Sequence, residues 1–201
     1  TASVDVVNPD TQVAQLSGFA YAPAPVVTSV TPPVGDVAGS TLVTLTGTGF
    51  VAGAIVDIGA VSCTGVVLQS WTSLTCTTGA NFPGDFDVTV TNTDTQFGLL
   101  SNGFTYRVPP TVTDALPGGG VIAGGTSVTL TGTGFLAGAV VRFDGLTSPS
   151  VTVNSATSIT ATSPAHPAAT VDVVVVNTDG LQGTLTNGYS FGTPPTVSSI
   201  S

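Results

Sequence analysis

An internal repeat with a fixed spacing constrains this chain more than any other feature. The heptapeptide Thr-Leu-Thr-Gly-Thr-Gly-Phe at residues 44–50 returns unchanged at residues 129–135, which is 85 residues later. Shorter matches follow at the same spacing: Asn92-Thr93-Asp94 with Asn177-Thr178-Asp179, Asn102-Gly103-Phe104 with Asn187-Gly188-Tyr189, and Pro109-Pro110 with Pro194-Pro195. No net insertion separates the two copies, so the chain contains two equivalent structural units.

Both ends of the chain continue this series. Gly18-Phe19 lies 85 residues before Gly103-Phe104, and residues 4–8 match residues 172–177 in character. We therefore expect four pieces: the last strands of one repeat in residues 1–24, whole repeats in 25–109 and 110–194, and the start of a further repeat in 195–201. On this reading the chain is part of a longer polypeptide or of a polymer subunit.

Each whole repeat carries a dense series of strand signals. In the first repeat the predicted strands are Val26–Val30, Thr41–Thr46, Ala54–Ile58, Val66–Gln69, Ser73–Thr77, Asp85–Asn92 and Gly103–Arg107. Alternation of apolar and polar residues is clearest at residues 42–46 and 86–91. The turns are assigned to glycines at positions 35, 39, 47, 49, 53 and 59. This pattern predicts an all-β chain of two-sheet sandwiches of the immunoglobulin type.

Composition excludes several classes of function. Charged residues make up 6% of the chain, all eleven acidic residues are Asp, and the net charge is −9. The two cations, Arg107 and Arg142, cannot form the basic patch that nucleic acid or an anionic membrane surface requires. The longest aliphatic run is Val173–Val176, which is far shorter than a membrane-spanning helix, so we expect no membrane insertion.

The order of these motifs resembles a known family. A P-x-x-G segment, the T-G-T-G-F block, a short V-x-I/F strand, a V-x-V-x-N-T-D strand and a closing N-G-F/Y strand are similar to the TIG or IPT immunoglobulin-like module. The resemblance covers nearly the whole chain, and it implies tandem TIG/IPT β-sandwiches in a linear array. Such modules occur in plexins and related receptors, in transcription factors, and in bacterial surface proteins and glycan-active enzymes.

The two cysteines form the strongest candidate site. Cys63 and Cys76 enclose twelve residues, and the second repeat has Ser148 and Ala161 at the equivalent positions. Joint loss of both cysteines is expected of a disulfide, and similar pairs occur in TIG modules of receptor ectodomains. A disulfide would indicate an oxidising compartment. The alternative is two buried free thiols.

Other polar motifs have a structural interpretation beside a functional one. His166, the only histidine, has no Cys or Glu nearby and is interpreted as a loop residue rather than a general base or metal ligand. Asn92 and Asn177, each followed by Asp at the second position, could supply oxygen ligands for calcium together with Asp85 and Asp87. Capping of a strand end by an Asx turn is the preferred interpretation.

Glycine-rich and aromatic segments are also interpreted structurally. The T-G-T-G-F block lacks the Lys of a phosphate-binding loop, so we expect a turn that brings Phe50 and Phe135 into the two cores. Core packing is preferred to a sugar-stacking platform for the aromatic residues of the closing strands, which are Phe104, Tyr106, Tyr189 and Phe191. Trp71 has no counterpart, because Ala156 takes its place, and it is the one ring considered for a contact surface.

No catalytic arrangement recurs in both repeats, so we expect no enzyme, no cofactor and no metal. The chain is interpreted as an extracellular or cell-surface segment of a stalk, fibre or filament that spaces or adheres. Its expected partners are neighbouring repeats or identical subunits, with a cell-surface or glycan ligand as a further candidate. The alternative is a ligand-binding or glycan-binding accessory module of a receptor or carbohydrate-active enzyme.

Overall fold

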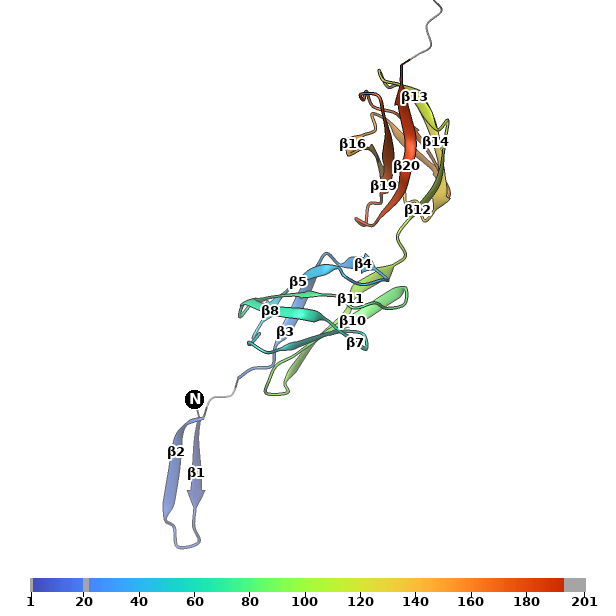
Figure 1. Cartoon of the computed structure of the whole chain (residues 1–201). Helices are drawn as coiled ribbons and strands as arrows, with labels where there is room; N and C mark the ends of the chain where they lie inside the picture. The colour runs from blue at the N-terminus through green and yellow to red at the C-terminus, as the bar shows by residue number, and fades with distance from the viewer. Residues whose placement is uncertain (1, 20–21, 194–201) are drawn as a thin grey trace, which may run out of the picture. The chain divides into compact units, whose positions relative to one another are not determined.

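The computed structural model describes residues 2–19 and 22–193, and all regular elements in these ranges are β-strands (Figure 1). Thr and Val are frequent in the strand segments, and these β-branched residues favour extended backbone. In the described part of the chain no helix is long and apolar enough to cross a membrane. The prediction of an all-β fold is therefore confirmed.

A two-stranded hairpin precedes the first repeat. Its strands are β1 (Ala2–Val7) and β2 (Val13–Phe19), which pair antiparallel. Residues 20–21 lie outside the described residues, as do the Pro194-Pro195 match and the segment 195–201.

The first repeat contains nine strands. They are β3 (Val26–Thr31), β4 (Val34–Asp36), β5 (Leu42–Thr48), β6 (Ile55–Ile58), β7 (Val61–Ser62), β8 (Thr64–Ser70), β9 (Ser73–Thr77), β10 (Gly84–Thr91) and β11 (Phe97–Arg107). They form a four-stranded sheet in the order β3-β5-β9-β8 and a five-stranded sheet in the order β4-β11-β10-β6-β7.

The second repeat has the same strands in the same order. They are β12 (Thr111–Leu116), β13 (Gly119–Val121), β14 (Ser127–Thr133), β15 (Val140–Phe143), β16 (Leu146–Thr147), β17 (Val151–Ser155), β18 (Ser158–Thr162), β19 (Ala169–Val176) and β20 (Gln182–Gly192). Its sheets have the orders β12-β14-β18-β17 and β13-β20-β19-β15-β16. The repeat predicted from the sequence is therefore also a repeat of strand topology.

Alternate residues of these strands fill the core of each sandwich. In β5, Val43 and Leu45 are fully buried, and Val128 and Leu130 occupy the equivalent places in β14. The predicted core aromatics are buried as well: Phe50, Phe104 and Tyr106 in the first repeat, and Phe135, Tyr189 and Phe191 in the second. In the second repeat the Phe143 ring packs edge-on against Tyr189 at 5.1 Å and against Phe191 at 6.3 Å between centroids.

The assignments of two glycines and the start of the last strand differ from the sequence prediction. Gly35 lies within strand β4 and Gly47 within strand β5, whereas both were assigned to turns. The last strand, β11, starts at Phe97 rather than at Gly103. It contains Asn102, whose positive φ of 50° interrupts the alternation of inward-facing and outward-facing side chains along the strand. The residues before Asn102 therefore show no period-two pattern that is continuous with those after it.

The contacts divide the chain into two compact units. The first comprises residues 1–33, 38–81 and 85–105, and the second comprises 34–37, 82–84 and 106–201. Arg107 and the whole second repeat thus belong to the second unit, and residues 22–25 belong to the first with the strands that follow them.

Candidate functional site

The Asn-x-Asp motif forms the same turn in both repeats. At the end of β10, Asn92 N–H donates to the Gln96 carbonyl at 2.9 Å, and Gln96 N–H donates to Asp94 Oδ1 at 3.1 Å. At the end of β19, Asn177 N–H donates to the Leu181 carbonyl at 2.9 Å, and Leu181 N–H donates to Asp179 Oδ1 at 3.1 Å. The prediction of Asx-type capping is confirmed at both positions.

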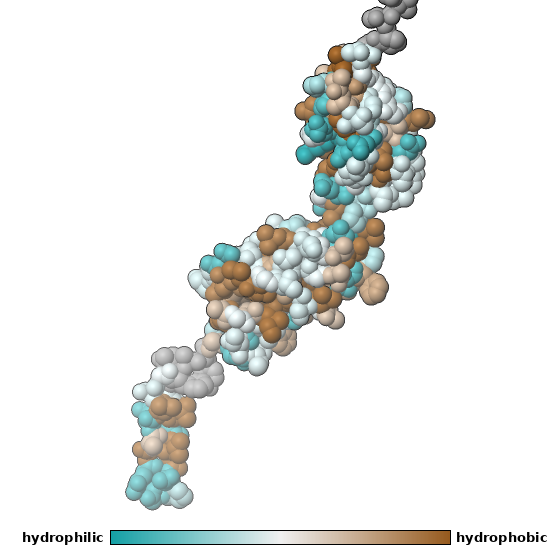
Figure 2. Space-filling view, in the orientation of Figure 1, coloured by the Kyte–Doolittle hydropathy of each residue, from teal (hydrophilic) through white to brown (hydrophobic). Residues whose placement is uncertain are grey.

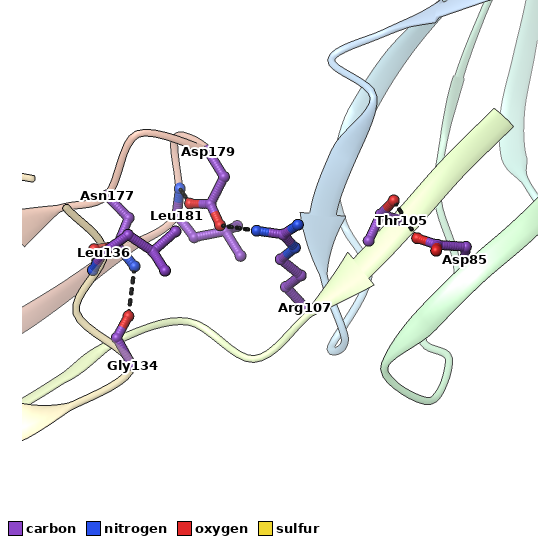
Figure 3. A network of polar contacts seen from close by, with 8 residues as sticks. All are labelled: Asp85, Thr105, Arg107, Gly134, Leu136, Asn177, Asp179 and Leu181. Carbon is purple, nitrogen blue, oxygen red and sulfur yellow. Dashed lines mark hydrogen bonds and ion pairs between the residues drawn. The ribbon is translucent and has the colours of Figure 1, made fainter. Parts of the chain in front are cut away.

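The asparagine of each turn reaches into the T-G-T-G-F block of the same repeat. Both Asn92 and Asn177 are 5% exposed, and their Nδ2 groups donate to the carbonyls of Gly49 at 2.8 Å and Gly134 at 2.7 Å. Asn177 Oδ1 also accepts a bond from Leu136 N–H at 3.1 Å (Figure 3). The two motifs that identify the repeat in the sequence are therefore bonded to each other in space.

The same turns contact the segment that leads into each repeat. We call residues 92–96 and 177–181 the linker-binding turns. In the first unit, Gln96 Nε2 donates to the Ala22 carbonyl at 2.9 Å and to Asp94 Oδ2 at 3.0 Å. In the second unit, Arg107 Nη1 donates to Asp179 Oδ2 at 3.4 Å (Figure 3). Ala22 and Arg107 are 85 residues apart and hence equivalent.

Glycines next to these turns admit the linker backbone. A Cβ atom on Gly98 would lie 2.2 Å from the Pro25 carbonyl oxygen, and one on Gly183 would lie 2.1 Å from the Pro110 carbonyl oxygen. No side chain fits at such distances, so glycine is required at both positions for the linker to pack as it does. No motif within a single repeat indicates these contacts, although the equivalence of Ala22 and Arg107 at the repeat spacing marks both as linker positions.

The cysteine pair lies between the two sheets of the first repeat. Cys76 in β9 is fully buried and pairs with Val43, while Cys63 N–H donates to the Val56 carbonyl at 2.8 Å. Both residues are thiols in this structure. A hydrogen bond between the two thiol groups lowers the pKa of Cys63, and together with burial it raises the pKa of Cys76. The thiols are therefore neighbours, and the disulfide stays a prediction.

Repeat 2 has a polar network where the first has its cysteines. Ser148 N–H donates to the Val141 carbonyl at 2.8 Å, as Cys63 does to Val56. Ser148 Oγ bonds with the carbonyls of Ser150 at 2.8 Å and Thr162 at 2.6 Å. Serine at this position thus links the segment before β17 to the end of β18.

His166 lies in the loop between β18 and β19, as predicted, but it is not a free loop residue. Its side chain is 9% exposed and its ring stacks on Phe191 with 4.8 Å between centroids. Nε2 lies 3.3 Å from Asp144 Oδ2, and Nδ1 lies 2.7 Å from the Pro167 carbonyl. These contacts give the histidine a packing role that no sequence signal indicated.

The remaining candidates separate into surface and structural positions. Trp71 is 67% exposed in the turn between β8 and β9, where its carbonyl accepts a bond from Phe50 N–H at 3.1 Å. Asp85 and Asp87 bond within the first repeat, to Thr105 Oγ1 at 2.7 Å and to Asn102 N–H at 2.8 Å. Among the described residues no three His, Cys, Asp or Glu side chains form a group that could hold a metal ion.

Comparison with known proteins agrees with this architecture. The family model described as "IPT/TIG domain" matches residues 25–106 and 110–192. A structure of the full extracellular region of plexin A4 is 21% identical, with a TM-score of 0.50 over 90% of this chain and 20% of that chain. A second plexin A4 structure is 21% identical, with a TM-score of 0.53 over 94% of this chain and 17% of that chain.

A further match has a lower structural similarity. SGBP-B from a complex xyloglucan utilization locus in Bacteroides uniformis is 19% identical, with a TM-score of 0.38 over 84% of this chain and 50% of that chain. This chain thus spans about a fifth of the plexin chains and half of the bacterial one. The two matched segments include both linker-binding turns and both T-G-T-G-F blocks, so the chain belongs to the IPT/TIG domain family and carries two of these domains in tandem.

Proposed function

We propose that this chain is a non-catalytic structural segment of an extracellular repeat array, which spaces or presents other parts of its protein. The observation that carries the proposal is the repeated contact between each linker-binding turn and the linker in front of it. Gln96 bonds to Ala22 in one unit, and Asp179 bonds to Arg107 in the other. A module that holds the chain leading into it transmits load along the chain.

The buried asparagines support the same function. Asn92 and Asn177 connect each linker-binding turn to the T-G-T-G-F block, so hydrogen bonds support the covalent attachment of the linker to the sandwich. The low charge and the acidic balance of the surface suit an extracellular setting, since two arginines give no basic patch for nucleic acid.

Single-molecule force spectroscopy tests this proposal. The chain is pulled from its two ends, and we expect two separate unfolding events, each releasing roughly 25–30 nm of contour length from some 85 residues. Asn177→Ala should lower the force of one event and leave the other unchanged. Smooth extension at low force without discrete events would contradict a load-bearing role.

A second candidate function is ligand binding at the β8–β9 turn. Trp71 favours it, because a large aromatic side chain that is 67% exposed is suited to stacking on a sugar ring. Affinity electrophoresis in xyloglucan and mixed-linkage glucan gels is the test. Retardation of the wild-type chain that Trp71→Ala abolishes would support binding. If neither protein is retarded in any gel, the structural function is the only candidate that remains.

A further inference from the structure

The β1–β2 hairpin exposes an apolar face. Val4 pairs with Leu16 and Val6 pairs with Ala14, so these four side chains lie on one face of the two-stranded sheet. Val4, Val6 and Leu16 are 46%, 62% and 68% exposed. Figure 2 shows brown, apolar residues along the visible surface of this hairpin. Three large apolar side chains on one side of an isolated hairpin need a partner surface.

From Val4 to Leu16 the hairpin matches β19–β20 position for position. In β19–β20, Val173 pairs with Leu185 and Val175 pairs with Gly183, which is the register of Val4 with Leu16 and of Val6 with Ala14. There the two valines are completely buried.

The turns match as well. Asn8 N–H donates to the Gln12 carbonyl at 2.9 Å and Thr11 N–H to the Asn8 carbonyl at 2.9 Å. Asn177 makes the same two bonds, with Leu181 at 2.9 Å and Gly180 at 3.0 Å. The Asp that follows also repeats its role, because Gln12 N–H donates to Asp10 Oδ1. Asn8 is exposed, however, whereas Asn177 is buried and bonded to the Gly134 carbonyl.

We propose that the β1–β2 hairpin binds a TIG half-sandwich through the face formed by Val4, Val6 and Leu16. The partner supplies the strands that residues 110–168 supply in the second repeat, including a T-G-T-G-F type turn. The glycine carbonyl of that turn accepts a hydrogen bond from Asn8 Nδ2, as Gly134 does from Asn177. This inference rests on the family and on the internal match, and it does not depend on the proposed mechanical function.

Ala14 specifies one way in which the partner differs from the two whole repeats. The equivalent Gly183 has room for no Cβ, because such an atom would lie 2.1 Å from the Pro110 carbonyl oxygen. Gly98 has the same restriction beside Pro25, at 2.2 Å. The linker strand of the partner must therefore lie farther from the hairpin than Pro25 and Pro110 lie from theirs.

A chimeric repeat tests the proposal. The full chain is extended at its N-terminus by residues 110–169, so that Ala169 precedes Thr1 and the hairpin follows the strands of a half-sandwich. Hydrogen exchange of the peptide spanning residues 2–19 is measured by mass spectrometry. We expect exchange at least roughly 100-fold slower than in the unextended chain, with further slowing in an Ala14→Gly variant.

Two matched variants test the face that binds. Val6 and Val7 are 62% and 61% exposed but point to opposite faces of the hairpin. In the chimera, Val6→Asp should abolish the protection and Val7→Asp should retain it. Equal effects of the two substitutions would overturn the proposal.

A folding control and an association control complete the experiment. The chain extended by the complete repeat, residues 110–193, shows that the added strands fold when their own hairpin follows. If that control folds and neither the chimera nor its Ala14→Gly variant protects the hairpin, the proposal is wrong. It is equally wrong if the unextended chain sediments as a dimer that Val6→Asp dissociates, since a second copy then covers the face.

Discussion

Equivalent residues of the two repeats stabilise the same contacts by different chemistry. Cys63 and Ser148 hold the same backbone position, and Cys76 and Ala161 pair with equivalent valines, Val43 and Val128. In the second repeat the Ser148 hydroxyl donates its one proton to the carbonyl of Ser150 or of Thr162 and accepts a bond from Thr162 N–H at 3.1 Å, so it is paired without a covalent link. Replacement of the cysteines by serine and alanine therefore leaves no unpaired polar group at this position.

We predict that Cys63 and Cys76 form a disulfide under oxidising conditions. The thiols are neighbours in the structure, and their pairing would stabilise the first repeat by roughly 3 kcal/mol through its short loop. Intact mass should rise by two hydrogen atoms on reduction, and hydrogen exchange should accelerate in the first repeat alone. Alkylation of both cysteines without a reductant would refute the prediction.

Loss of the buried asparagine of one linker-binding turn should destabilise only the repeat that contains it. Asn177→Ala leaves the Gly134 carbonyl and the Leu136 amide without their partner, and we expect a loss of about 2–3 kcal/mol from the free energy of unfolding. Chemical denaturation followed by hydrogen exchange measures this for each repeat.

The control is Asn8→Ala, because Asn8 is exposed in the same type of turn. Its effect should stay within about 0.5 kcal/mol. A similar loss for both variants would mean that the turn backbone, and not the buried side chain, carries the stability.

At the scale of elements, the sequence predicts strands well where side chains alternate and poorly where glycine or asparagine changes the backbone. Seven predicted strands of the first repeat are present, and Ser73–Thr77 has the predicted bounds. The short strands β4 and β7 were missed because three and two residues are too few to show a period. The linker contacts could not be predicted from one repeat, since they depend on backbone proximity that only the folded sandwich creates.

Substitution of Gly132 by alanine tests whether the T-G-T-G-F block requires glycine for close backbone packing. Gly132 lies within β14, and a Cβ atom there would be 1.9 Å from the Thr111 carbonyl oxygen and 2.6 Å from the Phe135 ring. Gly132→Ala must displace strand β12 or the core ring, so we expect a loss of about 3 kcal/mol or more in the second repeat.

Gly192→Ala is the matched control for this substitution. Gly192 is at the end of β20, and nothing lies within 4 Å of its added Cβ. Thermal unfolding of both variants should show a clear decrease of the melting temperature for Gly132→Ala only. Equal melting temperatures would show that β12 moves away at little cost.

For the whole molecule, the composition and the repeated linker contacts have a joint consequence. The chain carries few charges, so long-range repulsion within it contributes little. Pro109 and Pro110 fix two φ angles and favour extended backbone at Val108. Arg107 and Asp179 add an ion pair whose side chains are 50% and 9% exposed, and such a pair contributes at most about 1 kcal/mol.

We therefore predict a stiff connection in which the prolines matter more than the ion pair. Small-angle X-ray scattering of the chain should give a narrow distribution of distances between the repeats. Arg107→Ala should broaden it slightly, by the same amount that high salt does in the wild type, because screening weakens an exposed ion pair. Replacement of Pro109 and Pro110 by glycine should broaden it strongly, since flexible backbone replaces two fixed φ angles. A broad distribution in the wild-type chain would refute the stiff connection. Equal broadening by the arginine and proline variants would refute the larger contribution of the prolines.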